Sequence, residues 1–252
     1  MAKMKGVILA GGTGSRLGKL TTVLNKHLVA VGDVPMIEYP LATLKKIGIE
    51  DITIVTGAEH AGTVMQYLTK QHSGIDFTYK VQKTAGGIAQ ALALTENVCG
   101  NSRTAVILGD NIYEDNFRES AIKFGNIWEE PLVDCAGAMF FLKQVPDPQR
   151  FGVAELEGDK IKSIEEKPKK PKTNLAVTGL YFYDRTVFDK IRTLKPSARG
   201  EYEISEVNQM YVDEGRALFR IFDGFWSDAG TFESRRRAEE YVAQKGIDSF
   251  LE

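Results

Sequence analysis

Three glycines and one arginine lie close together near the start of the chain, directly after the apolar run Val7-Ile8-Leu9. The segment Leu9 to Lys19 has the sequence LAGGTGSRLGK, with glycine at 11, 12 and 14. Glycines let a ligand approach the main chain closely, so that successive N–H groups can point at phosphate oxygens. Arg16 adds a planar cation whose donors match such oxygens, and Lys26 follows further along. The segment therefore predicts a site for a phosphorylated ligand.

Two common phosphate-binding motifs do not fit this segment. The dinucleotide motif GxGxxG, started at Gly12, requires glycine where Leu17 stands. The P-loop motif GxxxxGK[ST], ending at Gly18-Lys19, requires glycine in place of Thr13 and a hydroxyl residue in place of Leu20. What remains is the pattern LAGGxGxRL, and the alternative to a phosphate site is a glycine-rich turn with a surface arginine.

Two aspartates are candidate ligands for a divalent cation. Asp110 stands just past a predicted strand over 104–108, at the edge where open α/β sheets bind ligands. Mg²⁺ takes few protein oxygens when phosphates provide the others, so a carboxylate there suits it. Asp228 lies in a glycine-containing turn before a predicted helix, where it serves either as a second ligand or as the helix cap. Thr231 can take the cap instead and leave Asp228 free.

Two further sets of polar residues follow predicted strands. Gln82 ends an alternating strand and Gly87 opens the next helix, so both are candidates to meet a nucleobase. The Gln82 amide offers a donor and an acceptor to a pyrimidine edge. Glu166 and Lys167 end a later strand, and from the residues alone they are as well explained as solvated surface charges.

Strands and helices alternate strictly in the N-terminal half. Apolar runs predict strands over 5–9, 51–55, 77–81 and 104–108, and helical periodicity predicts helices over 36–47, 60–69 and 88–98. Strands that are almost wholly apolar and separated by helices indicate a parallel sheet covered on both faces. We therefore expect an α/β fold with an open, mixed and mostly parallel sheet.

The strict alternation of predicted strands and helices ends at about residue 131. Strands are predicted over 135–141, 152–156, 161–164 and 176–183, and helices over 186–191, 204–212 and 232–242. We interpret this part as a β-rich lobe added to the same sheet and closing over one end of it. The run Lys167-Pro168-Lys169-Lys170-Pro171-Lys172 is expected to be an exposed connector within the lobe, so 1–252 is a single domain.

Composition excludes several classes of protein. The chain has 252 residues, 43% hydrophobic and 26% charged, with a net charge of −2, so it lacks the basic surplus on which nucleic-acid binding depends. No apolar stretch approaches the roughly 20 residues that span a bilayer, and we expect a cytoplasmic protein without a membrane partner. Two cysteines outside any CxxC pair and three scattered histidines argue against a disulfide framework or a zinc site.

In this setting the LAGGxGxRL string resembles the sugar-phosphate nucleotidyltransferases, also called nucleotide-sugar pyrophosphorylases, over nearly the full chain. Further motifs agree in order: Gly86-Gly87-Ile88-Ala89-Gln90-Ala91, Leu108-Gly109-Asp110-Asn111, Phe151-Gly152-Val153, Glu165-Glu166-Lys167-Pro168, and 194–201 with sequence LKPSARGE. The GIAQA and LKPSARGE segments are most like the thymidylyltransferases of this family, which join dTTP and glucose 1-phosphate into dTDP-glucose and pyrophosphate. The same reaction with UTP or another sugar 1-phosphate, and a non-catalytic sensor of sugar nucleotides, remain as alternatives.

The resemblance implies a Rossmann-like nucleotidyltransferase fold, with about 1–130 as the nucleotide-binding half and about 131–252 as the sugar-phosphate-binding half. It implies Mg²⁺-dependent in-line displacement without a protein nucleophile, with Arg16, Lys26, Asp110 and Lys167 catalytic and Asp110 and Asp228 as metal ligands. The implied nucleotide-binding residues are Leu9, Gly11, Gly12, Thr13, Gly14, Ser15, Arg16, Gln82, Gly87 and Asp110. The implied sugar-phosphate-binding residues are Lys26, Asn111, Gly152, Glu166, Lys167 and Val177.

The chain departs from the family pattern at two places. Gly18-Lys19-Leu20 stands where many relatives carry an aromatic residue and a proline, which either loosens the loop or adds a phosphate contact through Lys19. The sequence stops at Glu252, earlier than the longer thymidylyltransferases, whose extra C-terminal helices help to form a regulatory site, and this puts feedback inhibition in doubt. We also expect a homo-oligomer, although the sequence does not specify the number of subunits.

Overall fold

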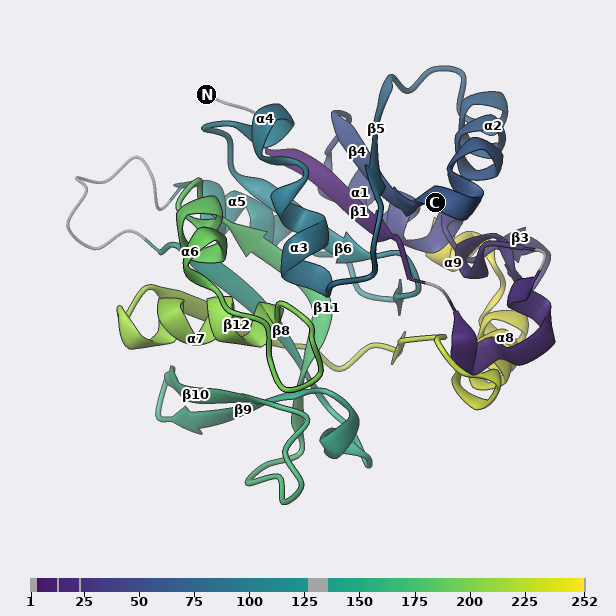
Figure 1. Ribbon diagram of the computed structural model, residues 1–252. Helices are drawn as coiled ribbons and strands as arrows, with labels where there is room; N and C mark the ends of the chain where they lie inside the picture. The colour runs from purple at the N-terminus through teal and green to yellow at the C-terminus, as the bar shows by residue number, and fades with distance from the viewer. Residues whose placement is uncertain (1–3, 13, 23, 127–135, 252) are drawn as a thin grey trace.

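A nine-stranded mixed sheet forms the centre of the computed structural model, which describes residues 4–12, 14–22, 24–126 and 136–251 (Figure 1). The strand order is β10-β9-β11-β6-β1-β4-β5, while β8 pairs with β11 and with β12. These strands are β1 (Lys5–Ala10), β4 (Ile52–Gly57), β5 (Phe77–Gln82), β6 (Thr104–Leu108), β8 (Ala138–Gln144), β9 (Gly152–Glu157), β10 (Lys160–Glu166), β11 (Leu175–Tyr183) and β12 (Ala217–Ile221).

Helices and short elements surround this sheet. The α-helices are α1 (Glu38–Ile47), α2 (Ala61–Gln71), α3 (Ile88–Ala93), α4 (Glu96–Cys99), α5 (Arg118–Asn126), α6 (Val187–Thr193), α7 (Ile204–Asp213), α8 (Phe232–Lys245) and α9 (Asp248–Leu251). The 3₁₀ segments are η1 (Ser15–Thr22), η2 (Lys26–Leu28), η3 (Ala58–His60) and η4 (Pro148–Arg150). Two-residue strands pair β2 (Ala30–Val31) with β3 (Val34–Pro35) and β7 (Ile112–Tyr113) with β13 (Trp226–Ser227).

The four strands of the N-terminal half run parallel, in the order β6-β1-β4-β5. Successive residues of β1 point to opposite faces, and each face has its own core. Val7 and Leu9 pack in a cluster with α3, α6 and α7, whereas Ile8 and Ala10 pack in a cluster with α1, α2 and α5. The predicted α/β sheet covered by helices on both faces is thereby confirmed.

Strand β11 runs antiparallel to the strands of the N-terminal half. It pairs antiparallel with β6, β8 and β9, and the β9–β10 hairpin extends the sheet beyond it. One continuous sheet therefore carries strands from both halves of the chain. Helix α8, near the end of the chain, returns to the start, where Arg235 donates to the carbonyl of Ala30 in β2 at 2.8 Å (Figure 1).

Two predicted elements differ from the observed ones. The helix expected over 88–98 is divided into α3 and α4, because Thr95 turns its hydroxyl and its N–H onto the carbonyl of Leu92, at 2.7 and 2.9 Å. The strand expected over 135–141 is β8, which begins at Ala138, and residue 135 lies outside the described residues. Strand β12 and helix α5 were not predicted. Within the described ranges, no helix combines the length and the apolar character needed to cross a membrane.

Asp184, directly after β11, bonds to residues of α7 and the turn that follows it. It lies at the end of the sheet opposite the carboxyl ends of the parallel strands. Its carboxylate is buried and accepts hydrogen bonds from Arg216 at 2.6 Å and from the Tyr211 hydroxyl at 2.8 Å. Asp184→Ala should lower the free energy of unfolding by about 2–4 kcal/mol, since the buried Tyr211 hydroxyl and the partly exposed Arg216 guanidinium both lose this partner. Urea denaturation measures the loss, and Glu214→Ala, which removes an exposed partner of the same arginine, should cost less than about 0.5 kcal/mol. Equal losses in the two variants would contradict this account.

Candidate active site

A cavity of about 470 Å³ opens at the carboxyl ends of the parallel strands. This is the edge at which open α/β sheets bind ligands. The glycine segment after β1, the strand ends of β5 and β6, and the start of α3 all contribute to its wall. The predicted site residues in the wall are Leu9, Gly11, Gly12, Gly14, Arg16, Lys26, Gln82, Gly87, Asp110 and Lys167. Leu9 and Lys167, 158 residues apart in the sequence, are thus brought to one place.

The glycine segment folds over Lys26. Gly14 has a φ of +68°, and an added Cβ there would lie 2.7 Å from the Cβ of Lys26 and 2.7 Å from Thr21. Glycine is therefore required for both backbone conformation and space. The Gly14 carbonyl accepts the N–H of Leu17 at 2.8 Å, within η1, which begins at Ser15. Thr13, predicted to bind nucleotide, lies outside the described residues.

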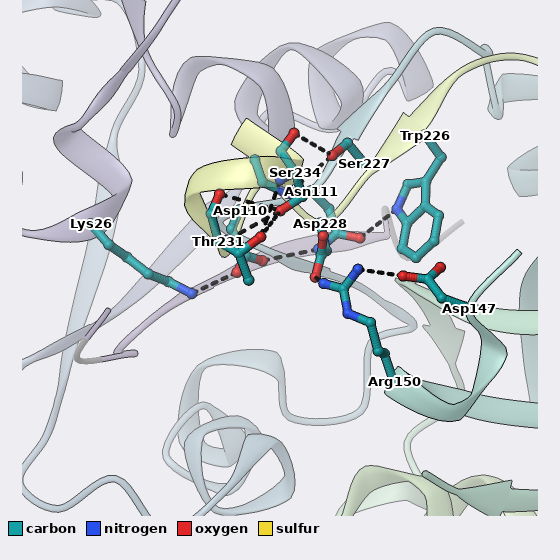
Figure 2. Close-up of polar contacts among 11 residues, drawn as sticks. Lys26, Asp110, Asn111, Asp147, Arg150, Trp226, Ser227, Asp228, Thr231 and Ser234 are labelled. Carbon is teal, nitrogen blue, oxygen red and sulfur yellow. Dashed lines mark hydrogen bonds and ion pairs between the residues drawn. The ribbon is translucent and has the colours of Figure 1, made fainter. Parts of the chain in front are cut away.

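Lys26 and Asp110 form a tight ion pair at the cavity wall. The Nζ atom lies 2.6 Å from Oδ2, and the side chains are only 11% and 12% exposed (Figure 2). Burial by itself raises the pKa of the Asp110 carboxyl, but the charge of Lys26 and the hydrogen bonds from Lys26 and Asn111 outweigh it and lower that pKa. Asp110 is therefore a carboxylate at neutral pH and is available to a cation.

Asp228 lies near Asp110 and is held by a different cation. Its Oδ2 accepts from Arg150 at 2.8 Å, and Arg150 also pairs with Asp147 at 2.7 Å (Figure 2). Burial and the negative charge of Asp110 raise the pKa of Asp228, against the opposing effects of Arg150 and Arg16. The two carboxylates are therefore close enough for the charge of one to affect the ionisation of the other. Gly230 lies close to both residues: an added Cβ there would lie 3.2 Å from Oδ2 of Asp110 and 3.2 Å from the backbone carbonyl oxygen of Asp228.

The start of α8 shows that Asp228 is not the helix cap. Thr231 is the N-cap: its side chain accepts the N–H of Ser234 at 3.1 Å, and the Ser234 side chain reciprocates in a capping box. Asp228 is consequently free of capping and faces Arg150. Among the described residues no group of three or more His, Cys, Asp or Glu could hold a metal ion, so Asp110 and Asp228 stand as a pair of carboxylates.

Of the residues predicted to bind the sugar phosphate, Lys26 and Lys167 lie in the cavity wall, while Gly152, Glu166 and Val177 meet on three neighbouring strands. Gly152 pairs with Val177 across β9 and β11 and with Glu166 across β9 and β10. An added Cβ on Gly152 would lie 3.6 Å from Glu166 Oε2 and 3.9 Å from Val177 Cβ, so the three residues enclose a small space. Lys167 lies in the cavity wall, with its Nζ 3.4 Å from Glu166 Oε1. Arg199 also reaches that carboxylate, at 3.3 Å.

Asn111 takes a buried position behind Asp110. Its Nδ2 donates to Asp110 Oδ1 at 3.0 Å, while its Oδ1 accepts from the Trp226 indole at 2.7 Å and from the N–H of Gly179 at 3.1 Å. With 1% of its surface exposed, Asn111 orients the Asp110 carboxylate in this structure. The contact predicted between Asn111 and a sugar phosphate stays a prediction.

Two non-glycine residues in or next to the predicted site have a strained backbone. Among the described residues, Lys167 (φ 44°) and Ala229 (φ 29°) are the non-glycine residues with positive φ. The first is itself a predicted site residue and the second directly follows Asp228. Non-glycine residues in this region persist where the surroundings hold them, and they cluster at functional sites. The strain therefore agrees with a functional role for both turns.

Several residues of the site were missed from the sequence. His27 and Glu201 lie in the cavity wall, and Arg150 holds Asp228. The only signal for His27 in the sequence was its position next to Lys26. Its ring is buried against Gly109, since an added Cβ on Gly109 would lie 2.7 Å from the His27 Cδ2. Nothing in the local sequence of Arg150 indicates a partner 78 residues later.

Comparisons with family models, with curated proteins and with solved structures all point to the same family. The family model described as nucleotidyl transferase matches residues 5–245. A glucose-1-phosphate thymidylyltransferase of Neisseria meningitidis is 42% identical over 95% of this chain and 82% of its own length, and that of Mycolicibacterium smegmatis is 41% identical with the same coverage. A solved structure of a candidate glucose-1-phosphate thymidylyltransferase from Bacillus anthracis, with sucrose bound, is 50% identical, covers 95% of both chains and has a TM-score of 0.88. A UDP-glucose pyrophosphorylase structure, 23% identical with a TM-score of 0.83, shares the fold.

His27 should make the fold sensitive to acid. Burial and the neighbouring Lys26 lower its pKa from 6.5 to about 3, against the opposing charge of Asp110. The folded ring therefore stays neutral while the unfolded chain takes up a proton below pH 6.5, so stability is lost as the pH falls from about 6.5 towards 3 and is unaffected above that window. At pH 5 this group alone should cost about 2 kcal/mol relative to pH 7.

Urea unfolding of wild type and of His27→Gln at pH 7 and pH 5 tests this prediction. Carboxylates titrate in both proteins, so the difference between the two pH dependences isolates His27. The variant should lose about 2 kcal/mol less than wild type over this interval. Equal losses would show that the ring titrates normally in the folded protein.

Proposed function

The chain belongs to the nucleotidyl transferase family, and we propose that it transfers the nucleotidyl group of dTTP to glucose 1-phosphate, giving dTDP-glucose and pyrophosphate. Relatives that carry this activity in their names are 41–42% identical over 95% of the chain. The observation that carries the proposal is one cavity whose wall brings together the backbone glycines, Arg16, Asp110 and Lys167.

The arrangement fits a reaction between two polyanions. An oxygen of the sugar phosphate attacks the α-phosphorus of dTTP in line, the new P–O bond forms, and the bond to the β-phosphate breaks to release pyrophosphate. No side chain has to form a covalent bond. We assign to Lys167 the binding of the attacking phosphate, and to Arg16 and the N–H groups of the glycine segment the charge of the departing pyrophosphate.

We propose Mg²⁺ as the cofactor, held by Asp110 and Asp228. Two carboxylates whose charges repel each other in a partly buried site suit a hard divalent cation, and the triphosphate can supply further oxygen ligands. When bound, Mg²⁺ would neutralise phosphate charge and fix the geometry of the triphosphate. Lys26 and Arg150 balance the charges of the two carboxylates in the protein itself. We assign to Lys26 the binding of a phosphate when a cation replaces it at Asp110.

We propose that the chain acts in the cytoplasm, where nucleoside triphosphates are available. We also propose that it is a homo-oligomer. Light scattering coupled to gel filtration measures the number of subunits. Uracil differs from thymine by one methyl group, worth about 1–3 kcal/mol in an apolar pocket, so use of UTP is expected beside dTTP.

A substrate panel tests the proposed reaction. Purified protein with glucose 1-phosphate and Mg²⁺ should release pyrophosphate fastest with dTTP, and UTP should give a kcat/KM lower by about 10- to 200-fold. Coupled pyrophosphate detection measures both rates. Absence of release with dTTP, UTP, CTP, ATP and GTP across several sugar 1-phosphates would exclude the reaction class, and a preference for UTP would move the assignment to the uridylyl analogue.

Asp110→Asn should lower kcat by at least about 100-fold, because it removes the charge that binds the cation and pairs with Lys26. Pyrophosphate release measures kcat, and circular dichroism verifies the fold. Asp159→Asn, an exposed carboxylate in the β9–β10 turn, is the matched control and should leave kcat within twofold. If Asp110→Asn turned over like the control, Asp110 would have no part in the chemistry.

A further inference from the structure

Two glutamine amides, Gln82 at the end of β5 and Gln90 in α3, are bonded to each other beside the cavity. The Nε2 of Gln82 donates to the Oε1 of Gln90 at 2.9 Å. Gln82 lines the cavity and is 7% exposed. A carboxamide has a donor end and an acceptor end of nearly equal shape, so the orientation of Gln82 decides which of the two a ligand meets.

The backbone fixes Gln90 first. The N–H of Gly86 donates to Gln90 Oε1 at 3.0 Å. An amide N–H requires an acceptor, so the oxygen of Gln90 and not its nitrogen must face Gly86. The amide is also packed tightly there, since an added Cβ on Gly86 would lie 2.4–2.6 Å from the Gln90 amide atoms.

Gln90 and a carbonyl then fix Gln82. The oxygen of Gln90 and the carbonyl oxygen of Gly87 both face one end of the Gln82 amide, at 2.9 and 3.4 Å. Both atoms are acceptors, so that end must be the NH₂ group, and its two N–H bonds are engaged. The position of Gly87 is itself set by close contact with another segment: its φ is +102°, and an added Cβ would lie 2.5 Å from the carbonyl oxygen of Tyr202.

The free end of Gln82 is therefore its oxygen. This atom lies against Gly11, where an added Cβ would be only 2.4 Å away, and both residues belong to the cavity wall. In the part of the chain that the structure describes, no hydrogen-bond donor reaches it. Gln82 therefore presents an acceptor alone to the cavity, and not both the donor and the acceptor that its residue type predicts.

We propose that Gln90 is a positioning residue that holds Gln82 as a hydrogen-bond acceptor, and that the cavity thereby selects nucleobases that present a ring N–H. Thymine and uracil carry such a group at N3, whereas the N3 of cytosine is itself an acceptor and would meet the Gln82 oxygen with two unpaired acceptors. This inference rests on the proposed function, since it assumes that the base of a pyrimidine nucleotide binds at Gln82.

Three proteins test the proposal: wild type, Gln90→Leu, which removes the acceptor, and Gln90→Glu, which keeps an acceptor oxygen. The measured quantity is kcat/KM with dTTP, UTP and dCTP at saturating glucose 1-phosphate. In Gln90→Leu the Gln82 amide can rotate, so the ratio of dTTP to dCTP should fall at least about tenfold, with Gln90→Glu within about threefold of wild type. The ratio of dTTP to UTP should stay unchanged in all three, because both bases carry the N3–H.

The internal ratios separate positioning from structural support. A residue that merely supports the loop would lower all three nucleotides together and leave the dTTP-to-dCTP ratio intact, which would overturn the proposal. An equal fall of that ratio in Gln90→Glu would overturn it as well. If circular dichroism shows that Gln90→Leu does not fold, Gln90→Asn withdraws the oxygen by one methylene group and is measured in the same way. Wild type inactive with every nucleotide would instead reject the proposed function.

Discussion

The ion pair between Lys26 and Asp110 links the two segments from which the rest of the site is built. Lys26 follows the glycine segment and Asp110 follows β6, 84 residues later, yet their charged atoms meet at 2.6 Å with little exposure to solvent. Charges that lose water must be paired or they destabilise the fold by several kcal/mol. The cavity can therefore hold Asp110 as a carboxylate because Lys26 is paired with it. Lys26 is in turn positioned by its close contact with Gly14 of the glycine segment.

The same requirement for charge balance extends into the second half of the chain. Asp228 is buried near Asp110, and Arg150, from the short η4 segment before β9, supplies its cation. The following residue, Phe151, packs edge-on against Trp226 at 5.1 Å, and the indole of Trp226 donates to Asn111 behind Asp110. The β-rich part is thus joined to the end of β6 by charge, ring packing and a hydrogen bond. A change in the charge of Asp110 or Asp228 would therefore alter contacts in both halves of the chain.

Much of the fold could be predicted from the sequence because strands buried on both faces leave an unbroken apolar run. Strand β6 matches its predicted range over 104–108, and the edge at which Asp110 would lie followed from it. The break at Thr95 was not predictable from periodicity, since the apolar pattern continues while the side chain bonds its own backbone. Arg150 and the buried state of Asn111 depend on segments far apart in sequence, so no local pattern could indicate them.

The pair of amides shows why residue type alone did not specify recognition. A glutamine at the end of β5 can offer either end of its amide, and the choice is made eight residues later by Gln90 and, through it, by a single backbone N–H at Gly86. Hydrogen-bond direction rejects a mismatched base strongly because both partners lose water without a bond, whereas a missing methyl group costs only a small amount of apolar contact. Under the proposed function, the orientation of one amide separates thymine from cytosine, whereas one methyl group separates thymine from uracil, so the two selectivities depend on different atoms.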